Sequence, residues 1–350
     1  MENETYPNLL PSYSLKPLPP LLPWISDFHL SLLLPVTAYW TISMIYWFID
    51  KKDYFSQYRL HTPAEFKHRN RVSAGEVFRA VVFQQIIQTC FGLVLGHFFG
   101  TIEYHGKEEY DIAIWTIRIR QAQQAIPSIF GVLGIDAKRL GQQLEGYSPS
   151  LTLMLRGQGS GIKNDASFAW EIWVAKVIFW VLDPAARFGI AIFFSDTWQY
   201  FWHRAMHANK WMYRKYSDHT LFHLLKVQTS GSNTLRSHTE AFSISRLILT
   251  LFFTGNIHAH HHRIYVPYAF GAFYNTLTEA FIVDTIGTTL SLMLSGLSTR
   301  QIIWFSTISV MKGVDDHCGY RIPWDPLQWL GEQNTAFHDV HHQSWGIKVS

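Results

Sequence analysis

The stretch LSLLLPVTAYWTISMIYWFI, residues 30–49, runs for twenty residues without a formal charge. A second stretch, AVVFQQIIQTCFGLVLGHFFGTI at residues 80–102, is also uncharged. A helix of about 20 apolar residues is long enough to cross the ~30 Å hydrocarbon core of a bilayer. Both stretches are therefore predicted to be transmembrane helices.

Three further apolar stretches are harder to assign. Residues 177–202 are interrupted by Asp183, Pro184 and Arg187, which favours either a kinked span or a hairpin that enters one leaflet. Residues 281–294 and 301–311 each fall short of a crossing and favour a re-entrant or interfacial helix pair. Helices are also expected near residues 111–126 and 134–146.

The composition agrees with a membrane protein. Of 350 residues, 48% are hydrophobic, 16% are aromatic and only 16% are charged, which disfavours a disordered or highly charged chain. The formal net charge of +3 comes without a basic stripe, so nucleic-acid binding is not expected. Two cysteines, Cys90 and Cys318, cannot form a disulfide framework.

The charge distribution predicts an orientation. The N-terminal tail before residue 30 has one basic residue, Lys16, whereas the loop between the first two spans has seven: Lys51, Lys52, Arg59, Lys67, Arg69, Arg71 and Arg79. The positive-inside rule then places that loop in the cytosol. If residues 80–102 cross outward and 177–202 cross back, the chain after residue 202 is cytosolic. The predicted fold is an all-α integral membrane protein, with transmembrane helices and a histidine-rich helical cap on the cytosolic face.

The histidines cluster in that cap. Thirteen of the 18 histidines lie at or beyond position 203, and most of them follow helical spacings. One box has the i, i+4 spacing and two have the i, i+3, i+4 spacing, which places the rings of each box on one helix face. The eight box histidines are His203, His207, His258, His261, His262, His338, His341 and His342.

Imidazole nitrogen suits zinc, copper, iron and nickel, and the cysteines do not form the pairs of a structural zinc site. Eight imidazoles are more ligands than one tetrahedral ion needs, so we favour two metal ions that share the boxes. Such a site favours oxygen chemistry over hydrolysis. Zinc peptidases have Glu directly after the first histidine, and this position is Arg204 here.

The five histidines that precede position 203 are given structural roles: His29, His61, His68, His97 and His105. His219 and His223 share the spacing of the first box. His203 and His207 are preferred because they directly follow an apolar stretch.

Several motifs together resemble one known family. They are DTWQYFWHRAMH (196–207), HAHHHRIYVPYAFG (258–271), DDHCGY (315–320) and HDVHHQSWG (338–346), with LHTPAE (60–65) and RNRVS (69–73) nearer the N-terminus. The chain resembles the fungal sphinganine C4-hydroxylases of the fatty acid hydroxylase and sterol desaturase superfamily. The resemblance covers most of the chain from about residue 20.

The resemblance implies a multi-pass endoplasmic reticulum enzyme whose active site faces the cytosol. Such an enzyme uses two iron ions and O2 to hydroxylate sphinganine or dihydroceramide at C4, giving phytosphingosine-type products. Its electrons come from NAD(P)H through cytochrome b5 and its reductase. The implied ligands are the eight box histidines together with His317, and Asp339 is expected to accept a hydrogen bond from a ligand imidazole.

The resemblance also divides the chain into an N-terminal tail (1–29), a transmembrane region with loops (30–202) and a histidine-box di-iron catalytic region (203–350). The sequence departs from the family in three places. About forty residues, at about 217–256, separate the first two boxes and are either a genuine insert or a retained intron. Thr276 and Leu277 stand where the family usually has His and Pro, and the chain stops four residues after Gly346.

Other possibilities stay open. Glu279 or Asp284 could attract the ammonium head of a substrate, or could end a helix or orient a ligand. The alternative functions are a sibling hydroxylase or desaturase acting on a sterol, fatty aldehyde or specialised lipid, an inactive lipid-binding pseudoenzyme, and a zinc-dependent membrane hydrolase.

Overall fold

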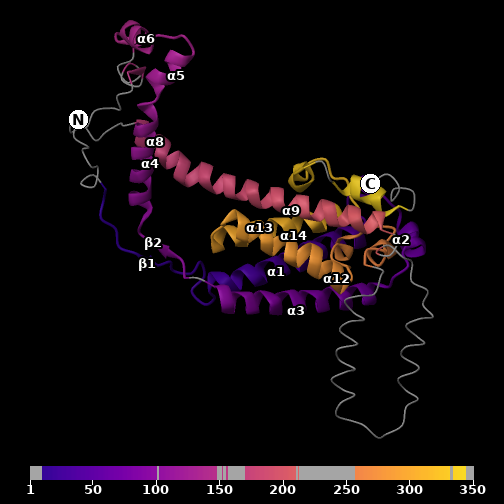
Figure 1. Cartoon of the computed structure of the whole chain (residues 1–350). Coiled ribbons are helices and arrows are strands. Elements are labelled where there is room, and N and C mark those ends of the chain that lie inside the picture. The colour runs from indigo at the N-terminus through magenta and orange to yellow at the C-terminus, as the bar shows by residue number, and fades with distance from the viewer. Residues whose placement is uncertain are drawn as a thin grey trace. The chain divides into compact units, whose positions relative to one another are not determined.

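A computed structural model describes residues 10–100, 102–147, 152, 155–156, 170–209, 212, 257–331 and 334–343 of the chain. These residues are mostly helical (Figure 1). Contacts divide the chain into two compact units, one of residues 1–19 and 102–189 and the other of residues 20–101 and 190–350. The proposed insert at 217–256, with His219 and His223, lies outside the described residues, as do residues 344–350.

The first unit holds a short antiparallel strand pair and a group of helices. Strand β1 (Lys16–Pro17) pairs with β2 (Tyr104–His105). Helix α4 (Glu108–Gln123) packs against α8 (Trp170–Val177) and is followed by α5 (Ile126–Val132) and α6 (Ala137–Leu144). The helices predicted near 111–126 and 134–146 are confirmed as α4 and α6, with shifted ends.

Among the described residues, four helical stretches are long and apolar enough to cross a membrane: Asp27–Lys51, Ala74–Phe99, Trp170–Ala208 and Leu277–Ser295. The first two are α1 and α3, and they confirm the spans predicted at residues 30–49 and 80–102. Each begins at a serine whose side chain accepts a backbone N–H of the first turn, Ser26 for α1 and Ser73 for α3.

Helices α1 and α3 pack antiparallel at close range. Gly96 near the end of α3 faces Phe28 near the start of α1, and Gly92 faces Leu32 one turn further along. A Cβ atom on Gly96 would lie 2.0 Å from the Phe28 ring, so the close approach requires glycine there.

The third candidate span is continuous. It consists of α8, a π-helical turn η3 (Ile178–Leu182) and α9 (Asp183–Ala208). Of the two possibilities considered for residues 177–202, the structure shows the single span and not the hairpin. Proline removes one helical hydrogen bond and crowds the preceding turn, and a π-helical turn directly before it accommodates both effects. Arg187, which also interrupts the apolar pattern, pairs with Asp183 at 2.7 Å.

The fourth candidate span is longer than predicted. Helix α12 (Leu277–Glu279), the π-helical segment η6 (Ala280–Ile286) and α13 (Gly287–Ser295) form one stretch of 19 residues. The expectation that this region falls short of a crossing is therefore wrong. The helix starts earlier because the Thr276 side chain caps it by accepting the N–H of Glu279.

Helix α14 (Thr299–Asp316) lies along α1 and runs in the same direction. Arg300 pairs with Asp27 at 2.9 Å where both helices begin, and the Tyr46 hydroxyl donates to Asp315 at 2.7 Å where both end. The turn from α13 into α14 passes through Gly296, whose φ of 62° favours glycine.

The last turns of α9 pack onto the fourth span. Gly287 leaves room for the Trp198 ring, and the Trp198 indole N–H donates to the carbonyl of Ile282 at 3.0 Å. This contact fixes the end of α9, which carries the first histidine box.

The histidine-rich region is built from short elements. The turn η4 (His261–Arg263) carries part of the second box, and η5 (Ala269–Gly271) follows that box. The turn η7 (Pro326–Trp329) follows His317, and α15 (Thr335–His342) carries the third box. They pack on a core that includes Tyr39, Val81, Ile264 and Val314.

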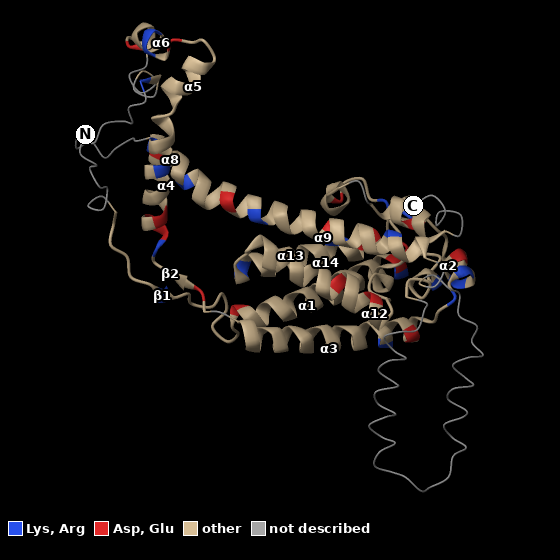
Figure 2. Cartoon of the chain, viewed as in Figure 1, with Lys and Arg blue, Asp and Glu red and all other residues tan. Residues whose placement is uncertain are grey.

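The loop between α1 and α3 contains η2 (Ser56–Tyr58) and α2 (Pro63–Arg69). Thr62 and Glu65 close a capping box at the start of α2. Lys and Arg residues lie on α2, whereas α1 and α3 carry charges only near their ends (Figure 2).

Candidate metal centre

The structure brings all nine predicted histidines together in two groups. The five-histidine group consists of His203, His207, His258, His262 and His341, and the four-histidine group consists of His261, His317, His338 and His342. Within each group, one ring nitrogen of every member lies within 4.8 Å of the others. The groups come from α9, the turn around η4, the end of α14 and α15.

The second and third boxes serve both groups in opposite ways. His258 and His262, at i and i+4, enter the five-histidine group, while His261, at i+3, enters the four-histidine group. In the third box the i and i+4 pair enters the four-histidine group and His341 the five-histidine group. On one helix face, residue i+3 lies beside the row formed by residues i and i+4. One turn can therefore direct histidines into two neighbouring groups.

The spacing of the nitrogens fits metal ligation. Nε2 of His203 lies 2.9 Å from Nε2 of His341. Nε2 of His338 lies 2.8 Å from that of His317 and 3.0 Å from that of His342. Two nitrogens bound at right angles to one cation at about 2.1 Å would be about 3.0 Å apart. The donor set therefore fits a transition metal in each group.

The outer nitrogens of several rings have acceptors that fix their orientation. Nδ1 of His342 lies 2.7 Å from the carbonyl of Ile264, and Nδ1 of His317 lies 2.8 Å from that of Gly313. A carbonyl can only accept a hydrogen bond, so Nδ1 carries the ring proton and the lone pair of Nε2 is directed into the group.

Glu279 orients one ring of the five-histidine group, that of His258, in the same manner. Its Oε1 lies 2.5 Å from Nδ1 of His258, and the two side chains are 6% and 5% exposed. Of the roles considered for Glu279, the structure supports the ligand-orienting one. Asp284 instead accepts hydrogen bonds from Asn275 at 3.2 Å and Gln84 at 3.5 Å.

The histidines are poised as neutral ligands. Burial, reinforced by neighbouring imidazoles, lowers the pKa of His341 to about 2, and burial lowers the pKa of His317 to about 4. The same causes hold the pKa of five further rings well below the usual value: His258, His261, His262, His338 and His342. Metal ligation needs the unprotonated nitrogen, so these rings are ready for it near neutral pH.

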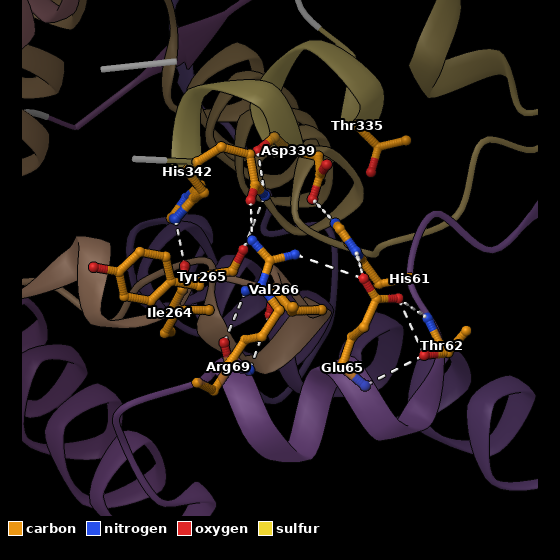
Figure 3. A network of polar contacts seen from close by, with 12 residues as sticks. His61, Thr62, Glu65, Arg69, Ile264, Tyr265, Val266, Thr335, Asp339 and His342 are labelled. Atoms are coloured by element: carbon orange, nitrogen blue, oxygen red, sulfur yellow. Dashed lines mark hydrogen bonds and ion pairs between the residues drawn. The ribbon is translucent and has the colours of Figure 1, made fainter. Parts of the chain in front are cut away.

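Residues 61–71, which we name the loop clamp, hold the third box (Figure 3). Nε2 of His61 lies 2.7 Å from Oδ1 of Asp339 on α15. Arg69 on α2 donates to the side chain of Gln343, which in turn donates to the carbonyl of Tyr265 at 3.1 Å. Asp339 thus contacts His61, a histidine outside both groups, where the sequence predicted a ligand imidazole as its partner.

The loop clamp also holds the segment that follows the second box. Asn70 exchanges two hydrogen bonds with the backbone of Val266, at 2.8 and 3.1 Å. The N–H of Arg71 donates to the carbonyl of Arg263 at 2.9 Å, and the Arg263 guanidinium donates to the carbonyl of Arg71. One loop therefore ties together two boxes that are far apart in the sequence.

The contact of His61 with the third box was not predicted from the sequence, where this residue was assigned a structural role. The motif LHTPAE was visible, but nothing in it indicated a partner 278 residues away. Of the other four histidines assigned structural roles, none belongs to either group. At the position of the zinc-peptidase glutamate, Arg204 donates to the Tyr200 hydroxyl at 2.6 Å.

Comparison with known proteins gives one family match and several relatives. A family model described as fatty acid hydroxylase matches residues 249–348. A sphingolipid C4-hydroxylase of Saccharomyces cerevisiae is 34% identical over 340 residues, which cover 97% of this chain and 72% of that protein. A sphingolipid C4-hydroxylase of Schizosaccharomyces pombe is 32% identical over 91% of this chain and 81% of its own length.

A plant protein gives a similar alignment. Sphinganine C4-monooxygenase 2 of Arabidopsis thaliana is 28% identical over 93% of this chain and 83% of its own length. No solved structure matches the chain significantly.

Proposed function

We propose that this chain, which belongs to the fatty acid hydroxylase family, hydroxylates a long-chain sphingoid base at C4. The substrate is sphinganine or dihydroceramide, and the product is of the phytosphingosine type. The observation that carries the proposal is the convergence of nine buried or half-buried imidazoles into two groups beside apolar helices. The named activities of the fungal and plant relatives supply the substrate class.

We further propose one iron ion in each group, with O2 as co-substrate and electrons from NAD(P)H through cytochrome b5 and its reductase. When bound, iron would supply the activation of O2 that insertion into an unactivated C–H bond requires. The balance is a C–H bond, O2, two electrons and two protons giving a C–OH group and water. Imidazole nitrogen is among the donors that suit iron, and the electron supply is assigned to a separate partner protein.

The chain's own residues hold and orient the centre. The Nε2 atoms face inward, while Glu279 and the backbone carbonyls fix the Nδ1 side. Met206, Trp202 and Val283 form an apolar cluster next to the first box. Such a wall keeps water from the reacting carbon and contacts an alkyl chain.

The proposed location is the endoplasmic reticulum membrane, with the metal centre on the cytosolic side. The four helical stretches of spanning length in the described part of the chain support a multi-pass protein. The basic loop between α1 and α3, which carries the loop clamp, supports the cytosolic side for the histidine groups that it contacts.

The test is expression of the full chain in cells that lack C4-hydroxylated long-chain bases, followed by lipid mass spectrometry. New phytosphingosine-type bases are expected, with about two irons per purified chain. His203→Ala should abolish the product, whereas His68→Ala, at an exposed residue of α2 outside both groups, should not. A hydroxylated sterol or aldehyde product would indicate a sibling enzyme, and a chain that binds one zinc and no iron would refute the proposal.

A further inference from the structure

A cavity of about 400 Å³ lies apart from the two histidine groups. One wall comes from the last turns of α1 and the start of α3, with Trp40, Trp47 and Phe78. The other wall comes from residues 266–270, after the second box, and 318–320, after His317. None of the nine histidines of the two groups lines it, so the cavity is separate from the metal centre.

The walls suit a hydrocarbon chain. Most of the lining is apolar and many of its side chains are aromatic, and the cavity volume lies in the range of about 300–1,000 Å³ typical of small-ligand sites. Trp47 is 49% exposed and Phe78 is 56% exposed, and they lie on the candidate spans α1 and α3, close to the end that enters the basic loop. Aromatic rings at this level are typical of the membrane interface. A lipid chain can therefore enter from the side of the bilayer.

The polar side of the cavity offers a carboxylate that shares its arginine with a second carboxylate. Arg59 and Asp50 line it and pair at 3.0 Å, while Asp53, behind Arg59, pairs with the same guanidinium at 2.7 Å. The Tyr320 hydroxyl, which accepts from Arg59, donates to Asp50 at 3.2 Å. One guanidinium thus serves two carboxylates that are 59% and 68% exposed. Asp50 shares that guanidinium and is more than half exposed, so its carboxylate can accept a further hydrogen bond from an ammonium group beside the aromatic walls.

We propose that this cavity binds one long-chain base outside the metal centre, with the alkyl chain between the aromatic walls and the ammonium group at Asp50. The ligand class rests on the proposed function. A phospholipid fits less well, since its second chain would need more room than the cavity of about 400 Å³ offers. The cavity adjoins the metal centre through His61, which lines it and bonds Asp339 on α15.

The test is photo-crosslinking of the full chain, purified into phosphatidylcholine nanodiscs, with a diazirine-bearing sphinganine. Mass spectrometry should find adducts on peptides that contain Trp47 or Phe78, and free sphinganine should suppress them. Ala74→Phe fills the cavity and should remove these adducts, whereas Ile86→Phe, on an exposed face of the same helix and outside the cavity, should keep them.

A pair of charge variants tests the ammonium contact. Asp50→Asn should weaken competition by sphinganine about two- to fivefold, as expected for a partly exposed ion pair. Asp53→Asn removes the same charge from the same arginine but does not line the cavity, so its effect should be smaller. Size-exclusion profiles check that each variant is folded.

The proposal is overturned if adducts persist in Ala74→Phe, or if a neutral long-chain alcohol or a phospholipid competes as well as sphinganine. Crosslinking does not need bound iron, so it can be measured on metal-free protein. Adducts at the cavity without any hydroxylation would sustain this site while refuting the proposed function. Hydroxylation without these adducts would support the proposed function while refuting this site.

Discussion

Replacement of Glu279 should loosen one metal ion and leave the other in place. Oε1 of Glu279 lies 2.5 Å from Nδ1 of His258, a member of the five-histidine group. Both side chains are almost fully buried, so in Glu279→Ala no solvent takes over as the acceptor. Loss of such an orienting partner typically costs about 10–100-fold in metal affinity, or about 1.4–2.7 kcal/mol.

The assay is chelator competition on purified chain loaded with two irons, with retained metal measured by mass spectrometry. In Glu279→Ala, one ion should leave at a chelator concentration about 10–100-fold lower than in the wild type. The second ion should leave at the wild-type concentration, since no contact joins Glu279 to the four-histidine group among the described hydrogen bonds. Glu279→Gln keeps an acceptor oxygen and should fall between the two.

Asp284→Asn provides the matched control. Asp284 is a second carboxylate of the same helical stretch, and its described partners are Asn275 and Gln84. Equal loosening of both ions in Glu279→Ala, or equal effects of the two variants, would refute the orienting role.

Three further predictions concern the fold around the site. In a double-mutant cycle, His61→Ala and Asp339→Asn should be coupled by about 0.5–3 kcal/mol in unfolding free energy, because the two side chains meet directly; additive effects would contradict the loop clamp. The metal-free chain should lose stability as the pH falls from about 6.5 towards 4, since the unfolded histidines take up protons while buried ones such as His317, with a pKa near 4, do not. The slope should be about 1.4 kcal/mol per pH unit for each such histidine, and flat thermal melts from pH 7 to 5 would argue against it. Gly96→Ala should destabilise the α1–α3 pair by about 1–3 kcal/mol because its Cβ would enter the Phe28 ring, whereas Gly75→Ala, with open space around it, should not.

The spans and the boxes could be predicted because each is a local pattern. Charge-free stretches and i, i+3, i+4 spacings depend only on neighbours in the chain, and α1, α3 and the boxes follow them. The ends of elements were less predictable, since they depend on single side chains. The Thr276 cap lengthens the fourth span, and the π-helical turn before Pro184 keeps α9 continuous.

Tertiary partners could not be predicted from spacing. No local pattern distinguishes His61 from the other isolated histidines, because its role depends on Asp339 at the far end of the chain. In the same way, the choice of Glu279 over Asp284 as the partner of His258 depends on the path between the second box and η6. The division of nine histidines into five and four is likewise a property of the packed helices.

Helix α15 shows why the loop clamp and the metal sites depend on each other. It has only eight residues, and an isolated helix of fewer than about 12 residues is marginal in water. Its three histidines share one face and serve both groups, so a rotation of this helix would disturb both at once. Asp339 and Gln343 follow on the adjacent flank, where His61 and Arg69 hold them. The loop clamp therefore restrains the rotation of α15 through Asp339 and Gln343, and bound metal ions would restrain it through the three histidines.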